Sequence, residues 1–169
     1  LSHVGAKTSD DAIRHSKKPV AYTHCLPSGL KEHQRNKSDG QLKFIADQGG
    51  FIGVTMFPAF LRRGTESTVD DYVEAMDYVI NLVGEECVGF GTDFTQDQSQ
   101  AWFDWLVHDK GDGRELIAFG EIINPLGMRT LGEYPNLTEA MLKHGWPETK
   151  ARKVLGENWL RVLKEVWSA

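Results

Sequence analysis

The sequence has few cysteines, no long apolar run and no basic block. Two cysteines, Cys25 and Cys87, are too few for a disulfide scaffold, so we expect reduced thiols in a cytoplasmic protein. No apolar run approaches the roughly 20 residues that span a membrane. The net charge of −5 comes without clustered basic residues, which argues against nucleic-acid binding. Being 40% hydrophobic and 25% charged, residues 1–169 have the composition of one ordinary globular domain.

Two common catalytic signatures are also absent. The sequence contains no Gly-x-Ser-x-Gly, the turn that presents a nucleophilic serine in many hydrolases. Gly89-Phe90-Gly91 has neither the third glycine nor the lysine of a phosphate-binding loop. Any chemistry must therefore come from other residues.

What the sequence does contain is a repeated strand–helix unit over residues 1–94. Apolar runs predict strands at 19–24, 51–57 and 87–94. A helix signal precedes each strand. The first helix starts at Thr8-Ser9 and ends near Lys17, and the second has a capping box from Ser38 to Gln41 and is closed by Gly49-Gly50. The third is an amphipathic stripe over 69–83 after Ser67. This alternation predicts an α/β fold with a parallel sheet and crossover helices.

The remaining residues follow a different pattern. Residues 95–135 mix polar and aromatic side chains and are too long for a plain connection, so we expect a lid or an interface segment. Three helices then follow, the first capped by Asn136, the second with Pro147 in its first turn and Gly156 at its end, and the last over 158–167.

Two histidines are the first candidates for chemistry. His24 ends the apolar strand at 19–24, and His3 lies 21 residues upstream across a helix-like segment. If both end adjacent parallel strands, their imidazoles meet in one pocket, where they suit Zn²⁺. The alternative is that each is a polar residue satisfied at a strand end. His15 and His33 are interpreted as surface residues, and His108 and His144, which lie in polar contexts, receive no role.

Two charged residues join this candidate site. Asp93 follows the third predicted strand, where a carboxylate beside two histidines can take a proton; its alternative role is to cap the loop. Arg35 follows the loop after His24, where its planar fork suits a substrate carboxylate; otherwise it is one solvated basic residue. Cys25 is a poor nucleophile candidate because neighbouring strand residues point opposite ways.

With these residues in place, the chain resembles the membrane (renal) dipeptidase family of zinc peptidases, in its soluble bacterial form. The matching pieces are Leu1 to Val4, Pro19 to His24, Arg35-Asn36, Val54 to Phe60, Gly89 to Phe94, Tyr134 to Leu137, and Leu155 to Asn158. Residues 95–130 depart noticeably, and Thr95-Gln96-Asp97 stands where relatives often have Asp-Gly.

The resemblance implies a TIM-like (β/α)8 barrel with extra C-terminal helices and a site for two zinc ions. His3 and His24 would bind one zinc, Arg35 would hold the carboxylate of a dipeptide, and Asp93 would contact the scissile region and transfer a proton. The family's other zinc ligands precede this segment. Because the chain opens at Leu1 without Met, we expect it to be the C-terminal half of such an enzyme, with the N-terminal half as its partner and a homodimer or larger assembly.

Two other functions stay open at this point. The first is a related amidohydrolase that acts on another small amide or lactam. The second is a non-catalytic binding module that kept the barrel and lost the chemistry. A substrate screen distinguishes the amidohydrolase from a dipeptidase. Measurement of the metal content distinguishes the non-catalytic module from either enzyme.

Overall fold

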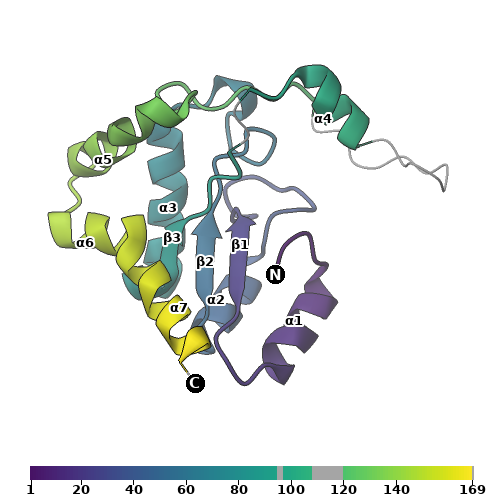
Figure 1. Cartoon of the computed structure of the whole chain (residues 1–169), viewed down its shortest axis with the longest axis vertical. Coiled ribbons are helices and arrows are strands. Elements are labelled where there is room, and N and C mark those ends of the chain that lie inside the picture. Colours follow the sequence, from purple (N-terminus) through teal and green to yellow (C-terminus); the bar gives the residue numbers. More distant parts are fainter. Residues whose placement is uncertain (95–96, 108–119, 169) are drawn as a thin grey trace.

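A parallel three-stranded sheet forms the centre of the protein (Figure 1). The computed structural model describes residues 1–94, 97–107 and 120–168. Strands β1 (Ala21–Cys25), β2 (Phe51–Val54) and β3 (Val88–Phe90) lie side by side in chain order. Each neighbouring pair is parallel, which a chain can achieve only through crossover connections. The predicted α/β organisation with a parallel sheet is therefore confirmed.

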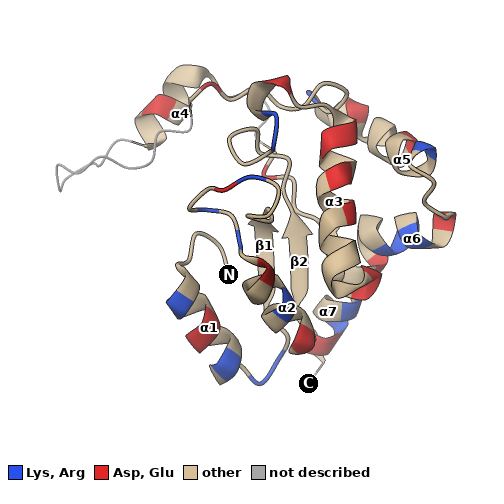
Figure 2. Cartoon of the chain, turned by 180° about the vertical axis from the view of Figure 1, so that it is seen from behind, with Lys and Arg blue, Asp and Glu red and all other residues tan. Residues whose placement is uncertain are grey.

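Helices surround this sheet. They are α1 (Ala6–His15), α2 (Asp39–Asp47), α3 (Val69–Val83), α4 (Gln100–Leu106), α5 (Tyr134–Lys143), α6 (Glu148–Arg152) and α7 (Asn158–Trp167), with short turns η1 (Gly64–Glu66), η2 (Glu85–Cys87), η3 (Leu131–Glu133) and η4 (Lys153–Glu157). Seen from behind, α2 and α3 lie in front of the strands (Figure 2). The α4 helix projects beyond the end toward which the strands run, while α7 lies near the opposite end (Figure 1).

The core is made by the residues whose pattern predicted burial. All four residues of β2 are buried, as its uninterrupted apolar sequence indicates for a strand covered on both faces. The α3 stripe, with Tyr72, Met76 and Val79, packs into the same cluster. The Tyr72 hydroxyl donates a 2.7 Å hydrogen bond to the Val54 carbonyl, which joins this helix to the end of β2.

Strand β1 has an irregularity just before His24. The register with β2 shifts between Tyr22 and Cys25, so the strand carries a local bulge there. The bulged backbone comes very close to two glycines, because a β carbon built on Gly53 or Gly91 would stand 2.2 or 2.0 Å from the Thr23 carbonyl oxygen. Glycine at both positions lets the backbones approach this closely.

All three strands are shorter than predicted. β1 begins at Ala21 instead of residue 19, β2 ends at Val54 instead of residue 57, and β3 covers 88–90 instead of 87–94. Thr55 explains the ends of β2 and β3. Its hydroxyl donates to the Thr92 carbonyl and accepts from the Phe57 amide, so side-chain hydrogen bonds take over between the ends of β2 and β3. On the other side, the Thr55 amide still bonds the Cys25 carbonyl of β1.

Several helix boundaries also differ from prediction. α1 begins at Ala6, before Thr8-Ser9, because the Gly5 carbonyl already accepts from the Ser9 amide. Thr68, and not Ser67, forms the capping box of α3. The α5 helix begins at Tyr134, and the Asn136 side chain bonds the Gly127 carbonyl instead of capping.

The boundaries of the C-terminal helices also differ from prediction. Pro147 caps α6 from just outside the helix. Gly156 does not end the helical region, because it lies within the wide turn η4 that leads straight into α7.

The 95–135 segment is described in part. Residues 95–96 and 108–119, which include Thr95, Gln96 and His108, lie outside the described residues. Its described part contains α4 and η3, and its Leu126 exchanges two backbone hydrogen bonds of 2.8 Å with the start of α3, at Ser67 and Val69. Across the described ranges, no helix is both long and apolar enough to cross a bilayer.

Candidate active site

His3 and His24 meet beyond the end of β1. Their Nε2 atoms lie 3.0 Å apart, and the rings are arranged edge to face with centroids 5.0 Å apart. His24 belongs to β1 itself and is partly buried. The two imidazoles thus converge as the spacing of 21 residues predicts.

His3 reaches this place without the strand that was predicted for it. Residues 1–5 form no strand, and His3 has a left-handed backbone with φ of 56°. The Leu1 nitrogen bonds the Ala21 carbonyl at the side of β1. Since non-glycine residues seldom adopt this conformation, it is a local strain of the kind found at functional sites.

The geometry of the histidine pair fits a shared metal ion. Two nitrogen ligands at about 2.0–2.1 Å in a tetrahedral site lie about 3.3 Å apart, close to the observed 3.0 Å between the Nε2 atoms. Among residues 1–94, 97–107 and 120–168, no group of three or more His, Cys, Asp or Glu residues is placed to hold a metal. Within the described residues, His3 and His24 are thus two candidate imidazole ligands, and a metal ion held by them would need further ligands.

A hydroxyl relay orients the His24 ring. Its Nδ1 lies 2.9 Å from the Thr23 hydroxyl, which in turn lies 2.6 Å from the Ser2 hydroxyl. When Nδ1–H donates to Thr23, Nε2 presents its lone pair toward His3. Such a partner on the second ring nitrogen is the usual way in which a metal-binding histidine is fixed.

Arg35 stands at the edge of the same site on a well-anchored loop. Its guanidinium lies 5.3 Å from the centre of the Phe60 ring, and the His33 ring packs on that phenylalanine at 4.8 Å. His33 also accepts the Arg35 backbone N–H at 3.1 Å, so it supports the loop and is not a plain surface residue. The buried Asn36 side chain donates to the carbonyls of Lys31 and Phe60, which fixes the loop against the β2–α3 connection.

Asp93 approaches from the third strand. It lies three residues beyond the end of β3, with a left-handed φ of 57°, so it does not end the strand directly. Its Oδ2 lies 4.0 Å from His24 Nε2. Nearby, the Thr92 hydroxyl lies 3.1 Å from the Tyr134 hydroxyl, which connects this loop to α5. The four candidate residues thus share one end of the sheet.

Burial and the charge of Arg35 lower the pKa of both imidazoles, which favours their neutral form. Burial is the main cause that lowers the pKa of His24, with Arg35 acting in the same direction and Asp93 opposing it. Burial also lowers the pKa of His3, and Arg35 and His24 add to the effect. A neutral imidazole is the form that binds a metal. Burial lowers the pKa of Arg35 as well, against the pull of Asp93.

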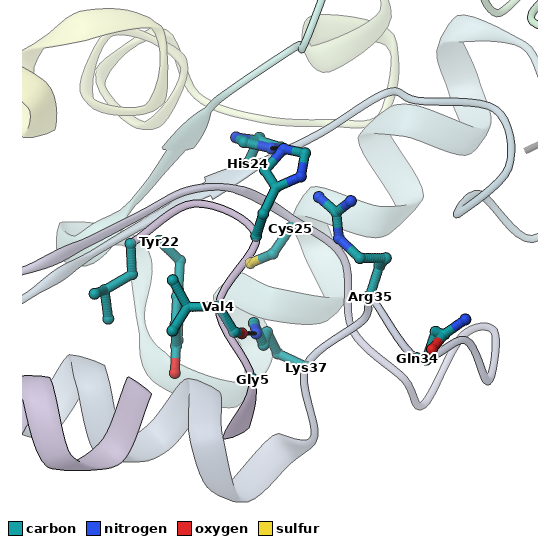
Figure 3. Close-up of a pocket in the computed structure, with 10 residues that line it drawn as sticks. Val4, Gly5, Tyr22, His24, Cys25, Gln34, Arg35 and Lys37 are labelled. Atoms are coloured by element: carbon teal, nitrogen blue, oxygen red, sulfur yellow. Dashed lines mark hydrogen bonds between the residues drawn. The ribbon is translucent and has the colours of Figure 1, made fainter. Parts of the chain in front are cut away.

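Two cavities flank these residues. One has a volume of about 140 Å³ and is lined by His3, His24, Arg35 and deeper groups such as Cys25 and Lys37. Figure 3 shows the Arg35 guanidinium directed toward the His24 ring, with Gln34 turned away. Burial raises the pKa of the Cys25 thiol to about 12, so this cysteine stays protonated and inert, as expected.

The second cavity is a feature that the sequence did not predict. It has a volume of about 160 Å³ and joins His3, Arg35 and Asp93 to the apolar side chains of Phe57, Phe60, Trp102, Phe103 and Leu106. The contacts of Thr23 with His24, and of Asn36 with Lys31 and Phe60, were not predicted from the sequence either. The aromatic content and length of the segment after Asp93 predicted a lid or an interface segment, but not which of its residues lie beside the site.

Comparison with known proteins decides the family. The model of the membrane dipeptidase family (peptidase family M19) matches residues 1–108 and 113–169. The chain belongs to the membrane dipeptidase family. It corresponds to the C-terminal half of that family, and it spans about half the length of the relatives it matches.

Three members of this comparison illustrate the similarity. A crystal structure of an amidohydrolase from Pseudomonas aeruginosa is 65% identical with a TM-score of 0.95, over 99% of this chain and 51% of that one. A metallopeptidase from Rhodobacter sphaeroides, bound to a phosphinate mimic of L-Ala-D-Ala, is 29% identical with a TM-score of 0.77, over 99% and 42%. An uncharacterized Klebsiella pneumoniae protein from the pqqA 5′ region is 32% identical, over 99% of this chain and 54% of its own length.

Proposed function

We propose that this chain is the C-terminal half of a zinc-dependent dipeptidase. The observation that carries the proposal is the pair of His3 and His24 nitrogens 3.0 Å apart, beside Arg35 and Asp93. His3 and His24 would hold one of two zinc ions. Zinc supplies a Lewis acid that generates a water nucleophile near neutral pH and polarises the scissile carbonyl.

The other two residues act on the substrate. Arg35 would bind the C-terminal carboxylate of the dipeptide through its planar fork, held in place by Phe60 and the Arg35 loop. Asp93, 4.0 Å from His24, would accept the proton released by the attacking water and pass it to the leaving amine. Its carboxylate is partly exposed, so it can exchange protons with substrate in the cavity.

The same proposal covers the rest of the enzyme. The three parallel strands would be part of a (β/α)8 barrel domain, in which residues 1–169 form the C-terminal portion. The N-terminal half would close the barrel and supply the remaining zinc ligands, because the described residues offer no third ligand. We also propose a cytoplasmic location, since both cysteines are free, and a homodimer or larger assembly.

One observation favours a second candidate. The relative with 65% identity is called an amidohydrolase, a broader class than dipeptidase. The enzyme would then act on another small amide or lactam with the same four residues. A screen of dipeptides against N-acyl amino acids and lactams, ranked by kcat/KM, distinguishes the two.

The test uses a completed enzyme, in which the upstream half of the Pseudomonas aeruginosa relative precedes Leu1. We expect it to bind zinc and to hydrolyse dipeptides, and to lose hydrolysis when the zinc is chelated. His24→Ala should lower both zinc content and kcat, whereas His15→Ala, on the exposed face of α1, should change neither. Zinc is measured by elemental analysis and hydrolysis by release of free amino acids.

Two results would contradict this function. One is dipeptide hydrolysis that survives removal of zinc or the His24→Ala change. The other is full activity of the 169-residue chain alone, because it contains only two of the proposed zinc ligands. We expect that chain alone to be a poor catalyst with low zinc affinity, and to aggregate through the open edges of its sheet.

A further inference from the structure

The second cavity has a polar end and an apolar wall. Arg35, His3 and Asp93 line one end, and the rest of its lining is aromatic or aliphatic. Such a combination, apolar with a few convergent polar groups, is typical of a small-molecule site. The polar end belongs to the active site proposed above, so the apolar wall lies within reach of a bound substrate.

Two separate parts of the chain build this wall. Phe57 and Phe60 follow β2, and their rings lie 5.0 Å apart. From the other side, α4 contributes Trp102, Phe103 and Leu106, at the helical spacing of three to four residues that places side chains on one face. Trp102 and Phe103 contact each other edge to face at 5.1 Å, and Phe103 is buried.

The α4 helix, which carries three of the five apolar side chains of the wall, is fixed at its start. The Ser99 hydroxyl accepts the Trp102 backbone N–H at 3.2 Å as an N-cap. The Gln100 side chain bonds the Gly120 carbonyl and the Ile122 amide, at 3.1 Å each. These contacts tie α4 to the chain that returns toward α5, although the helix projects from the body (Figure 1).

Arg35 determines which part of a substrate faces the wall. Its guanidinium stacks near Phe60, which is itself part of the wall, so a carboxylate bound by Arg35 lies beside the aromatic rings. In a dipeptide, one carbon joins that carboxylate to the side chain of the C-terminal residue. The amino-terminal residue lies across the scissile bond, on the side of the histidine pair.

We propose that this cavity receives a large apolar side chain on the C-terminal residue of the substrate. The substrate class is dipeptides that end in residues such as leucine, methionine or phenylalanine, and Trp102 and Leu106 are specificity-determining residues. This inference rests on the proposed dipeptidase function and adds to it the preference at one position. Removal of apolar side-chain surface from water drives the selection.

The experiment compares two dipeptide pairs with the completed, zinc-loaded enzyme. Alanyl-leucine and alanyl-alanine are assayed, each with the second residue in the L and in the D form. We expect kcat/KM to favour the leucyl dipeptide by roughly 10- to 100-fold, the range for a few added carbons in an apolar pocket. Trp102→Ala should reduce this ratio about tenfold. Leu106→Asp, at an exposed position, should also reduce it by charging the wall.

Trp105→Ala is the matched control. Trp105 is on the same helix but 55% exposed, and it does not line the cavity, so this change should leave the ratio unaltered. A second readout is inhibition by phosphinate dipeptide mimics with a leucyl or alanyl side chain next to the carboxylate, whose Ki ratio should follow the same order. This readout measures binding and not turnover.

The outcomes separate the two proposals. A parent enzyme without preference, or Trp102→Ala and Leu106→Asp variants that keep the parent ratio, would overturn the cavity assignment while dipeptide hydrolysis still stands. An enzyme that binds zinc but hydrolyses neither dipeptide would remove the dipeptidase function. A ratio that falls equally in Trp105→Ala would show a general effect of α4 and also overturn the assignment.

Discussion

The carbonyl oxygen of Thr23 lies directly against Gly53, where a β carbon would stand 2.2 Å from it. Gly91 faces the same oxygen, with a hypothetical β carbon at 2.0 Å. Real β carbons essentially never come so close to a backbone oxygen, so neither glycine can gain a side chain without movement of β1. Because Thr23 and His24 are neighbours, such a movement displaces the candidate zinc ligand as well.

Gly53→Ala should therefore destabilise the protein by about 1–3 kcal/mol or more, the usual cost of overpacking. Urea unfolding of the chain or of the completed enzyme measures the change. Gly40→Ala is the control, because its β carbon would meet only the Ser38 hydroxyl, at 3.9 Å, and alanine suits a helix. Equal unfolding free energies for the two variants would show that β1 adjusts freely.

Arg35→Met should remove the preference for a free substrate carboxylate. We expect kcat/KM for a dipeptide to fall by about 2–5 kcal/mol in transition-state stabilisation, since a buried carboxylate would lack its partner. Hydrolysis of the matching C-terminal amide should change little. Arg62→Met, at an exposed ion pair with Glu74, serves as control and should leave both rates as they are. Equal losses on the acid and the amide would argue against the role of Arg35.

Asp93→Asn should lower kcat by roughly 10²–10⁴, the contribution of a positioned acid or base. Asparagine tolerates the left-handed backbone that Asp93 adopts, so thermal stability and zinc content should stay close to the parent values. Asp97→Asn is the control, because Asp97 is also left-handed, with φ of 63°, and lies outside both cavities. A variant that retains its kcat would indicate that Asp93 only shapes the loop.

Cys87 should make stability decrease at alkaline pH. Burial raises the pKa of its thiol, against a smaller opposite effect of Arg161. In the unfolded chain this thiol ionises near pH 8.5. Its contribution is therefore fully present below that pH and is lost as the pH rises toward the folded pKa, since the unfolded state releases the proton first.

Urea unfolding from pH 7 to 10 checks this expectation. Cys87→Ala should flatten the decrease above pH 8.5, whatever it costs at neutral pH. Cys25, whose pKa is raised to about 12, contributes equally to the pH dependence of unfolding in the parent and the variant. The difference between their two pH profiles therefore comes from Cys87. Parallel pH profiles for the parent and the variant would contradict the burial effect.

The features that depend on local pattern were predictable. The continuous apolar run at 51–54 and the α3 stripe identified a strand and a helix that occupy the core. The spacing of His3 and His24 predicted that their rings meet, and they do. The strand and the helix depend on periodicity, which a sequence records directly. The histidine rings meet although the strand predicted for His3 is absent.

The features that depend on distant contacts were not predictable. Strands β2 and β3 end early at a contact of Thr55 with Thr92, 37 residues away. The cavity wall requires α4 to come back beside Phe57 and Phe60, and the helix itself shows only local signals. Left-handed backbone at His3 and Asp93 could not be foreseen either, because nothing in residue type requires it.

The chain-order arrangement of the sheet has a consequence for biosynthesis. Because β1, β2 and β3 are neighbours in the order in which they are translated, each strand can pair with its predecessor as it leaves the ribosome. Asp93 emerges 90 residues after His3, an interval of about 5–18 s at 5–20 residues per second. His3 and His24 are therefore synthesised before Asp93, so the two imidazoles of this segment are available before its carboxylate.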